Sequence, residues 1–99
     1  MAVLTVIMKR GFDDDRVVVS VDGRVVFDRE HVRLRRQINR CAAFDCEVAP
    51  GAVEVEVQVP DRGLTAHRRV HVADHTTVLA SIDERRLEIT DHPGVLGDA

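Results

Sequence analysis

The clearest pattern along the chain is an alternation of apolar and polar residues between residues 53 and 72. Valine occupies each odd position of residues 53–59, and glutamate or glutamine occupies each even position. Successive side chains on a β-strand point to opposite faces, so one face of this segment is expected in the core and the other in solvent. The return segment, residues 64–72, ends in Val70 and Val72 on its apolar face. The pattern predicts an antiparallel hairpin around a turn at residues 60–63.

The charges on the polar faces support one register for this hairpin. If Val59 faces Leu64 across the turn, Glu56 falls opposite His67, and this cross-strand pair can carry opposite charges. Only Arg68 interrupts the apolar face of the return strand. The register is therefore self-consistent, with one exception to the alternation.

A second hairpin is predicted around Asp22 and Gly23. This dipeptide favours a type I′ turn, and β-branched residues fill the flanking segments 16–21 and 24–28. Closure by two residues predicts the pairs Val21 with Arg24, Val19 with Val26 and Val18 with Phe27.

Four further segments are typical of strands, namely residues 3–9, residues 42–48, and residues 76–82 and 86–91, which form a last hairpin. The natural pairing of that hairpin places Ile82 opposite Leu87 and Ala80 opposite Ile89. Residues 29–40 show mixed periodicity and are interpreted as an irregular crossover with at most one or two helical turns.

About seven or eight short strands with little or no helix predict an all-β fold. We expect an antiparallel β-sandwich of two sheets rather than a small barrel, with an immunoglobulin-like, a transthyretin-like or a jelly-roll arrangement. The chain shows no internal repeat and no composition shift, so residues 1–99 are expected to form a single domain with a short C-terminal tail at residues 92–99.

Composition narrows the possible functions. Apolar residues make up 44% of the chain, charged residues make up 31%, and the formal net charge is -3. No apolar run reaches the ~18 residues of a membrane-spanning helix, and no signal-peptide pattern follows Met1. The acidic balance argues against general binding to nucleic acid. We therefore expect a soluble cytoplasmic protein.

The two cysteines, Cys41 and Cys46, are expected to be free thiols. On one extended strand their Cα atoms would lie ~16 Å apart, which is too far for a disulfide. Free thiols fit a reducing cytoplasm. Alternation places Cys46 on an apolar face, where an inert thiol is expected and a nucleophile with a nearby base is not.

Three histidines recur every fourth residue, at His67, His71 and His75, and Asp74 precedes the last of them. On a helix this spacing would place the three imidazoles on one face, where they could bind zinc. On a strand, residues four apart lie ~13 Å from each other, whereas two ligands of one zinc ion need their nitrogens within ~4 Å. The strand pattern favours solvent-facing imidazoles paired with neighbours such as Glu56. A metal site of His67, His71, His75 and Asp74 is the alternative.

Other candidate sites are less specific. The adjacent carboxylates at 13–15 lack the spacing of a calcium loop and are interpreted as a solvated acidic loop. A basic cluster at positions 33, 35, 36 and 40 could meet an acidic partner or form a solvated face. The chain contains no Gly-x-Ser-x-Gly elbow and no glycine-rich phosphate loop. The sequence thus predicts no cofactor and no catalytic residue.

Aromatic residues are scarce, with three Phe, no Tyr and no Trp. Carbohydrate-binding sandwiches and single-strand nucleic-acid binders commonly stack their ligands on exposed rings. Both classes are disfavoured. The leading hypothesis is a small non-catalytic interaction domain that contacts a protein partner or a second copy of itself in a homodimer. The alternative is a metal-binding protein or metal-dependent hydrolase that uses the histidine-rich segment.

Overall fold

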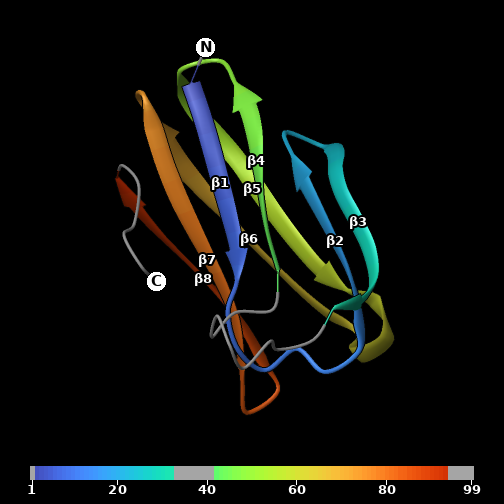
Figure 1. Cartoon of the computed structure of the whole chain (residues 1–99). Coiled ribbons are helices and arrows are strands. Elements are labelled where there is room, and N and C mark those ends of the chain that lie inside the picture. The colour runs from blue at the N-terminus through green and yellow to red at the C-terminus, as the bar shows by residue number, and fades with distance from the viewer. Residues whose placement is uncertain (1, 33–41, 94–99) are drawn as a thin grey trace.

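The computed structural model describes residues 2–32 and 42–93 of the 99-residue chain. These ranges form two four-stranded sheets that pack face to face, the β-sandwich that the alternating pattern predicts (Figure 1). The strands are β1 (Ala2–Met8), β2 (Asp15–Val21), β3 (Arg24–Val32), β4 (Ala42–Val48), β5 (Gly51–Val59), β6 (Leu64–Val72), β7 (His75–Asp83) and β8 (Arg86–Pro93).

One sheet has the strand order β4-β1-β7-β8, and the other has the order β3-β2-β5-β6. Neighbouring strands are antiparallel except for β1 and β7, which pair in parallel. In an immunoglobulin sandwich the first strand adjoins the second, whereas here it lies between the fourth and the seventh. The observed order therefore excludes the immunoglobulin arrangement.

The hairpin of β5 and β6 has the register that the charge pattern predicts. Val59 lies opposite Leu64, and Glu56 lies opposite His67. The valines at positions 53, 55, 57, 59, 70 and 72 are all buried. The 3₁₀ turn Pro60–Arg62 joins the two strands. No helix in the described ranges is long and apolar enough to cross a membrane.

The hairpin of β2 and β3 has the predicted turn but a different register. Asp22 and Gly23 both have positive φ values, 51° and 83°, as a type I′ turn requires. Val21 pairs with Arg24, but an irregularity after Ser20 then places Val19 opposite Phe27 rather than Val26. The predicted pairs of Val19 with Val26 and Val18 with Phe27 are therefore wrong. The extra residue turns Phe27 inward, where only 9% of it is exposed.

Two predicted boundaries also differ from the structure. Strand β3 continues to Val32, so residues 29–32 belong to a strand rather than to the crossover. The remainder of the crossover, residues 33–40, lies outside the described residues. Strand β8 continues to Pro93, so the first two residues of the predicted tail extend the last hairpin. That hairpin has the predicted pairs, Ile82 with Leu87 and Ala80 with Ile89.

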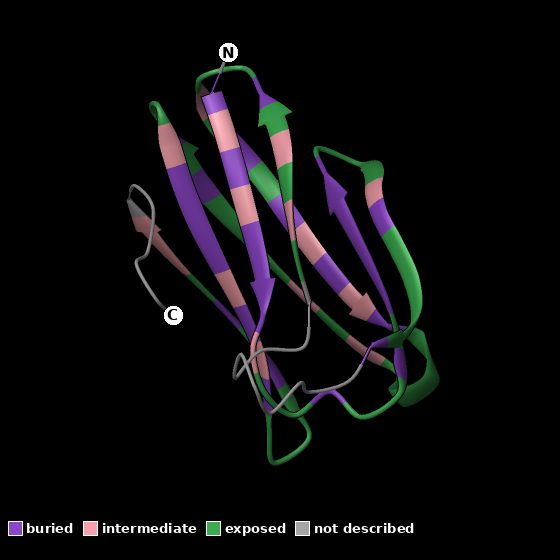
Figure 2. Cartoon of the chain, viewed as in Figure 1, coloured by how far each residue is buried: buried purple, intermediate pink, exposed green. Residues whose placement is uncertain are grey.

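The two sheets enclose one hydrophobic cluster to which all eight strands contribute (Figure 2). Different contacts close its two sides. Where β3 lies near β4, the rings of Phe27 and Phe44 stack with their centroids 4.6 Å apart. Where β6 lies near β8, Arg68 forms an ion pair with Asp91. Arg68 interrupts the apolar face of β6 because it reaches a carboxylate of the opposite sheet.

Candidate functional site

The residues of the candidate metal site are divided between the two sheets. His67 and His71 are exposed on the outer face of β6, and their separation of four strand residues keeps their imidazoles apart. His75 begins β7 in the other sheet, and Asp74 lies in the connection before it. In the described ranges no group of three or more His, Cys, Asp or Glu side chains could hold a metal ion. The structure therefore gives no geometric support to this alternative.

His75 takes part in a hydrogen-bonded chain on the outer face of its sheet. Its Nε2 lies 2.7 Å from Oγ1 of Thr5, and that hydroxyl donates to Oδ1 of Asp45 at 2.6 Å. A hydroxyl has one proton to donate. Because an ionised Asp45 accepts that proton, Nε2 of His75 must carry its own hydrogen and donate to Thr5.

This order of donors disfavours nucleophilic catalysis. A hydroxyl nucleophile needs a base that removes its proton, and in a Ser-His-Asp triad the histidine is that base. Here the imidazole donates to Thr5 instead of accepting from it, and the carboxylate contacts the hydroxyl directly. The chain of Asp45, Thr5 and His75 therefore ties β4, β1 and β7 together across the sheet.

The acidic segment at 13–15 is only partly solvated, so the prediction of a solvated acidic loop is wrong for Asp15. Asp13 and Asp14 are exposed, but Asp15 is only 5% exposed at the start of β2. Arg62 neutralises Asp15 with bonds of 2.8 and 3.1 Å, and the backbone N–H of Asp13 donates to the same carboxylate. A buried charge needs such partners. Asp15 therefore fastens β2 to the turn before β6.

Among the described residues, Cys46 has no partner that would activate it as a nucleophile. Cys46 is a half-buried free thiol on β4, and its Sγ lies 3.7 Å from the backbone oxygen of Glu47. Its side chain points inward, as the alternation predicts, and no histidine hydrogen-bonds to it among the described residues. Cys41 and the basic cluster at positions 33, 35, 36 and 40 lie outside the described residues.

The free edges of the sheets offer a different kind of site. An edge strand presents unpaired N–H and C=O groups that can pair with another chain, and proteins protect such edges with bulges, proline or inward-pointing charges. Strand β3 has two register shifts along its length. Strands β6 and β8 each carry an inward-pointing charge, Arg68 and Asp91, and β8 ends in Pro93.

Strand β4 has none of these protective features. It pairs with β1 at each position from Ala42 to Val48 without a register shift, and it contains no proline, lysine or arginine. Its inward side chains include the half-buried Phe44 and Cys46. Its charges, Asp45 and Glu47, both lie on the outer face. Among the edges of the two described sheets, β4 is the one best able to accept an added strand.

Sequence reasoning did not identify this edge. Which strands lie at an edge depends on the strand order, and that order requires β1 to pair with a strand about 70 residues further along the chain. The sequence does show that segment 42–48 contains no proline, lysine or arginine. That absence indicates an edge open to pairing only when β4 is known to lie at the edge of a sheet.

Comparisons with known proteins found no match: no protein-family model, no curated protein and no solved structure matches this chain.

Proposed function

We propose that this chain is a small non-catalytic interaction domain that acts through protein–protein contacts and pairs with a second copy of itself along the free edge of β4. The observation that carries the proposal is the regular β4 edge, which over Ala42–Val48 has no register shift, no proline and no inward-pointing charge. The other three edges of the described sheets are bulged or carry inward charges. The free thiol of Cys46 supports a cytoplasmic location as part of the same proposal.

A two-fold axis restricts how two β4 strands can pair. Residues directly opposite each other in an antiparallel pair must share a face, so the axis passes beside a residue of β4. An axis beside Asp45 would place the Asp45 carboxylates of the two copies opposite each other. An axis beside Cys46 would place Asp45 of one copy opposite Glu47 of the other. Centring on Phe44 opposes Asp45 of each copy to Ala43 of the other, which avoids direct like-charge contact. We therefore expect the axis at Phe44.

Ala43 provides a charge test of this pairing because it is exposed on the outer face of β4. A lysine there would face Asp45 of the second copy, whereas a glutamate would repel it. Each cross-strand pair contributes roughly 0.2–1 kcal/mol, and the axis doubles it, so the dimer Kd should change by about 2- to 30-fold in each direction. Sedimentation equilibrium at micromolar concentration measures the Kd for Ala43→Lys and Ala43→Glu.

The matched control makes the same two changes at Thr65, which is exposed on the outer face of β6. These variants should leave the Kd unchanged. Added salt should strengthen the wild-type dimer because it screens the repulsion between two copies that each carry a net charge of -3. A monomer mass for the wild type and for Ala43→Lys at all concentrations would refute the proposal, and equal effects at the two positions would reject β4 as the interface.

A further inference from the structure

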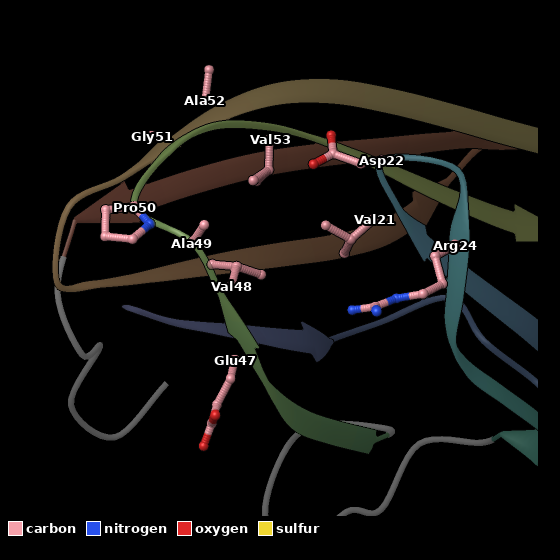
Figure 3. A pocket seen from close by; sticks show the side chains of 10 residues that line it. All are labelled: Val21, Asp22, Arg24, Glu47, Val48, Ala49, Pro50, Gly51, Ala52 and Val53. Carbon is pink, nitrogen blue, oxygen red and sulfur yellow. The ribbon is translucent and has the colours of Figure 1, made fainter. Parts of the chain in front are cut away.

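A cleft of about 490 Å³ opens at one end of the sandwich, and this volume lies in the range of small-ligand sites. The end of β4, its turn into β5 and the β2–β3 hairpin line it (Figure 3). Val21, Val48 and Val53 give it an apolar base, and each is less than a tenth exposed. The cleft therefore offers an apolar surface that lies between the two sheets.

Arg24 supplies a positive charge at this apolar base. Figure 3 shows its guanidinium pointing into the cleft. Within residues 2–32 and 42–93, the guanidinium of Arg24 forms no hydrogen bond or ion pair. Arginine binds carboxylates with two parallel hydrogen bonds, and those bonds are shorter and stronger than neutral ones.

Two carboxylates also line the cleft, but neither neutralises Arg24. Oδ1 of Asp22 accepts a hydrogen bond of 2.9 Å from the backbone N–H of Glu54, which holds Asp22 at the rim. Glu47 points away from the base of the cleft (Figure 3). Among the described residues that line the cleft, Arg24 is therefore the charged side chain that points inward and has no ion-pair partner.

We propose that this cleft binds a small organic acid in which a carboxylate adjoins an apolar body. The carboxylate pairs with the guanidinium of Arg24, and the apolar body covers Val21, Val48 and Val53. This binding goes beyond the proposed self-association and does not depend on it, because the cleft is formed within one copy of the chain.

The test uses 4-phenylbutanoate, with 4-phenylbutanamide as its uncharged counterpart. Titration into ¹⁵N-labelled full-length protein should shift the amide signals of the three valines, with a Kd of about 1 mM as expected for a ligand of this size. The amide should bind about tenfold more weakly, and Arg24→Gln should weaken binding of the acid by about tenfold, because each change removes a charge-assisted hydrogen bond. The matched control is Arg69→Gln, which should bind the acid like the wild type. Arg69 is an exposed arginine of β6 that lies opposite Glu54 on the outer face of the sheet, away from the cleft.

The outcomes separate the proposal from its alternatives. Equal affinity for acid and amide, equal affinity of Arg24→Gln and wild type, or shifts confined to other strands would each refute it. Absence of shifts at about 10 mM acid would also refute it, because a site of this chemistry should be mostly occupied at that concentration. An acetylated dipeptide ending in phenylalanine, with a free or amidated terminus, distinguishes the source of the carboxylate. Tighter binding of the free-terminus peptide than of 4-phenylbutanoate would assign the cleft to protein C-termini rather than to small acids.

Discussion

Val57→Ala tests the assignment of the core face of β5. Val57 has no exposed surface, and Val19 and Ala66 lie opposite it on the neighbouring strands. Loss of two carbon atoms removes about 1.6 kcal/mol of transfer free energy at ~0.8 kcal/mol each. A residual cavity of up to about 50 Å³ adds about 1.2 kcal/mol at ~24 cal/mol per Å³. We expect the free energy of unfolding to fall by about 1.5–3 kcal/mol, according to how far the neighbours relax.

Urea unfolding followed by far-ultraviolet circular dichroism measures this change. The matched control is Glu56→Ala on the adjacent residue, whose side chain points to the opposite face toward His67. Exposed or half-exposed charge pairs contribute little, so the control should lose less than ~1 kcal/mol. Both variants should retain the wild-type dependence on urea concentration, since neither changes the surface that unfolding exposes.

Equal losses for the two variants would refute the face assignment, because one substitution removes core packing and the other a solvated pair. A loss of less than ~0.5 kcal/mol for Val57→Ala would refute the magnitude, since no relaxation can recover the transfer term completely.

Four other predictions concern turns, charges and metal. Gly23→Val should lower the free energy of unfolding by more than about 1 kcal/mol, because Gly23 has a φ of 83° that a valine adopts only with backbone strain. No atom lies within 4 Å of the added Cβ, so a steric clash does not contribute. A thermal melt unchanged from the wild type would contradict this prediction. The two-residue turn at Glu84 and Arg85 has positive φ values of 49° and 68°, which Asn and Gly adopt more easily. Replacement of both residues by Asn-Gly should therefore raise the free energy of unfolding by about 1 kcal/mol in urea titrations. A lower free energy of unfolding would argue against a turn with two positive φ values. The hydrogen bond from Arg16 lowers the pKa of Asp28, so its stabilising effect exists above the unfolded-state pKa and disappears as the pH falls through the lower folded-state value. Asp28→Asn should therefore be less stable than the wild type at pH 7, and the difference should vanish once the pH lies below the folded-state pKa, as pH-dependent unfolding would reveal. Elemental analysis of untagged protein should give substoichiometric zinc, iron and copper, because the histidines of β6 and β7 are not brought together, and one equivalent of any of them would restore the metal hypothesis.

Local periodicity predicted the strands and two of the three hairpin registers. In β5 a polar residue separates each valine from the next, so a slip by one residue would turn the whole apolar face into solvent. The β2–β3 hairpin lacks that constraint, because Val25, Val26 and Phe27 are all apolar and either alternation provides an inward face. A bulge decided between them by placing Phe27 against Phe44 of the other sheet.

The candidate sites were less predictable than the strands. Alternation correctly indicated that the imidazoles of His67 and His71 face solvent, because that depends on one strand alone. The contact of His75 with Thr5 could not be predicted, since it joins strands 70 residues apart. Arg24 is also unremarkable as a residue after a turn, and it became a candidate only when the end of β4 was placed beside it.

The sequence by itself determined the all-β class, the hairpin turns and the faces of the central strands, because each of these follows from the side-chain period and from backbone preferences within a few residues. The tertiary structure decided the strand order, the parallel pairing of β1 with β7 and the function of Arg68 as a partner of Asp91. It also decided that β4 lies at a sheet edge and that Arg24 lines a cleft with an apolar base. These features depend on contacts between distant segments, and similar apolar faces allow many such contacts until the whole core is packed.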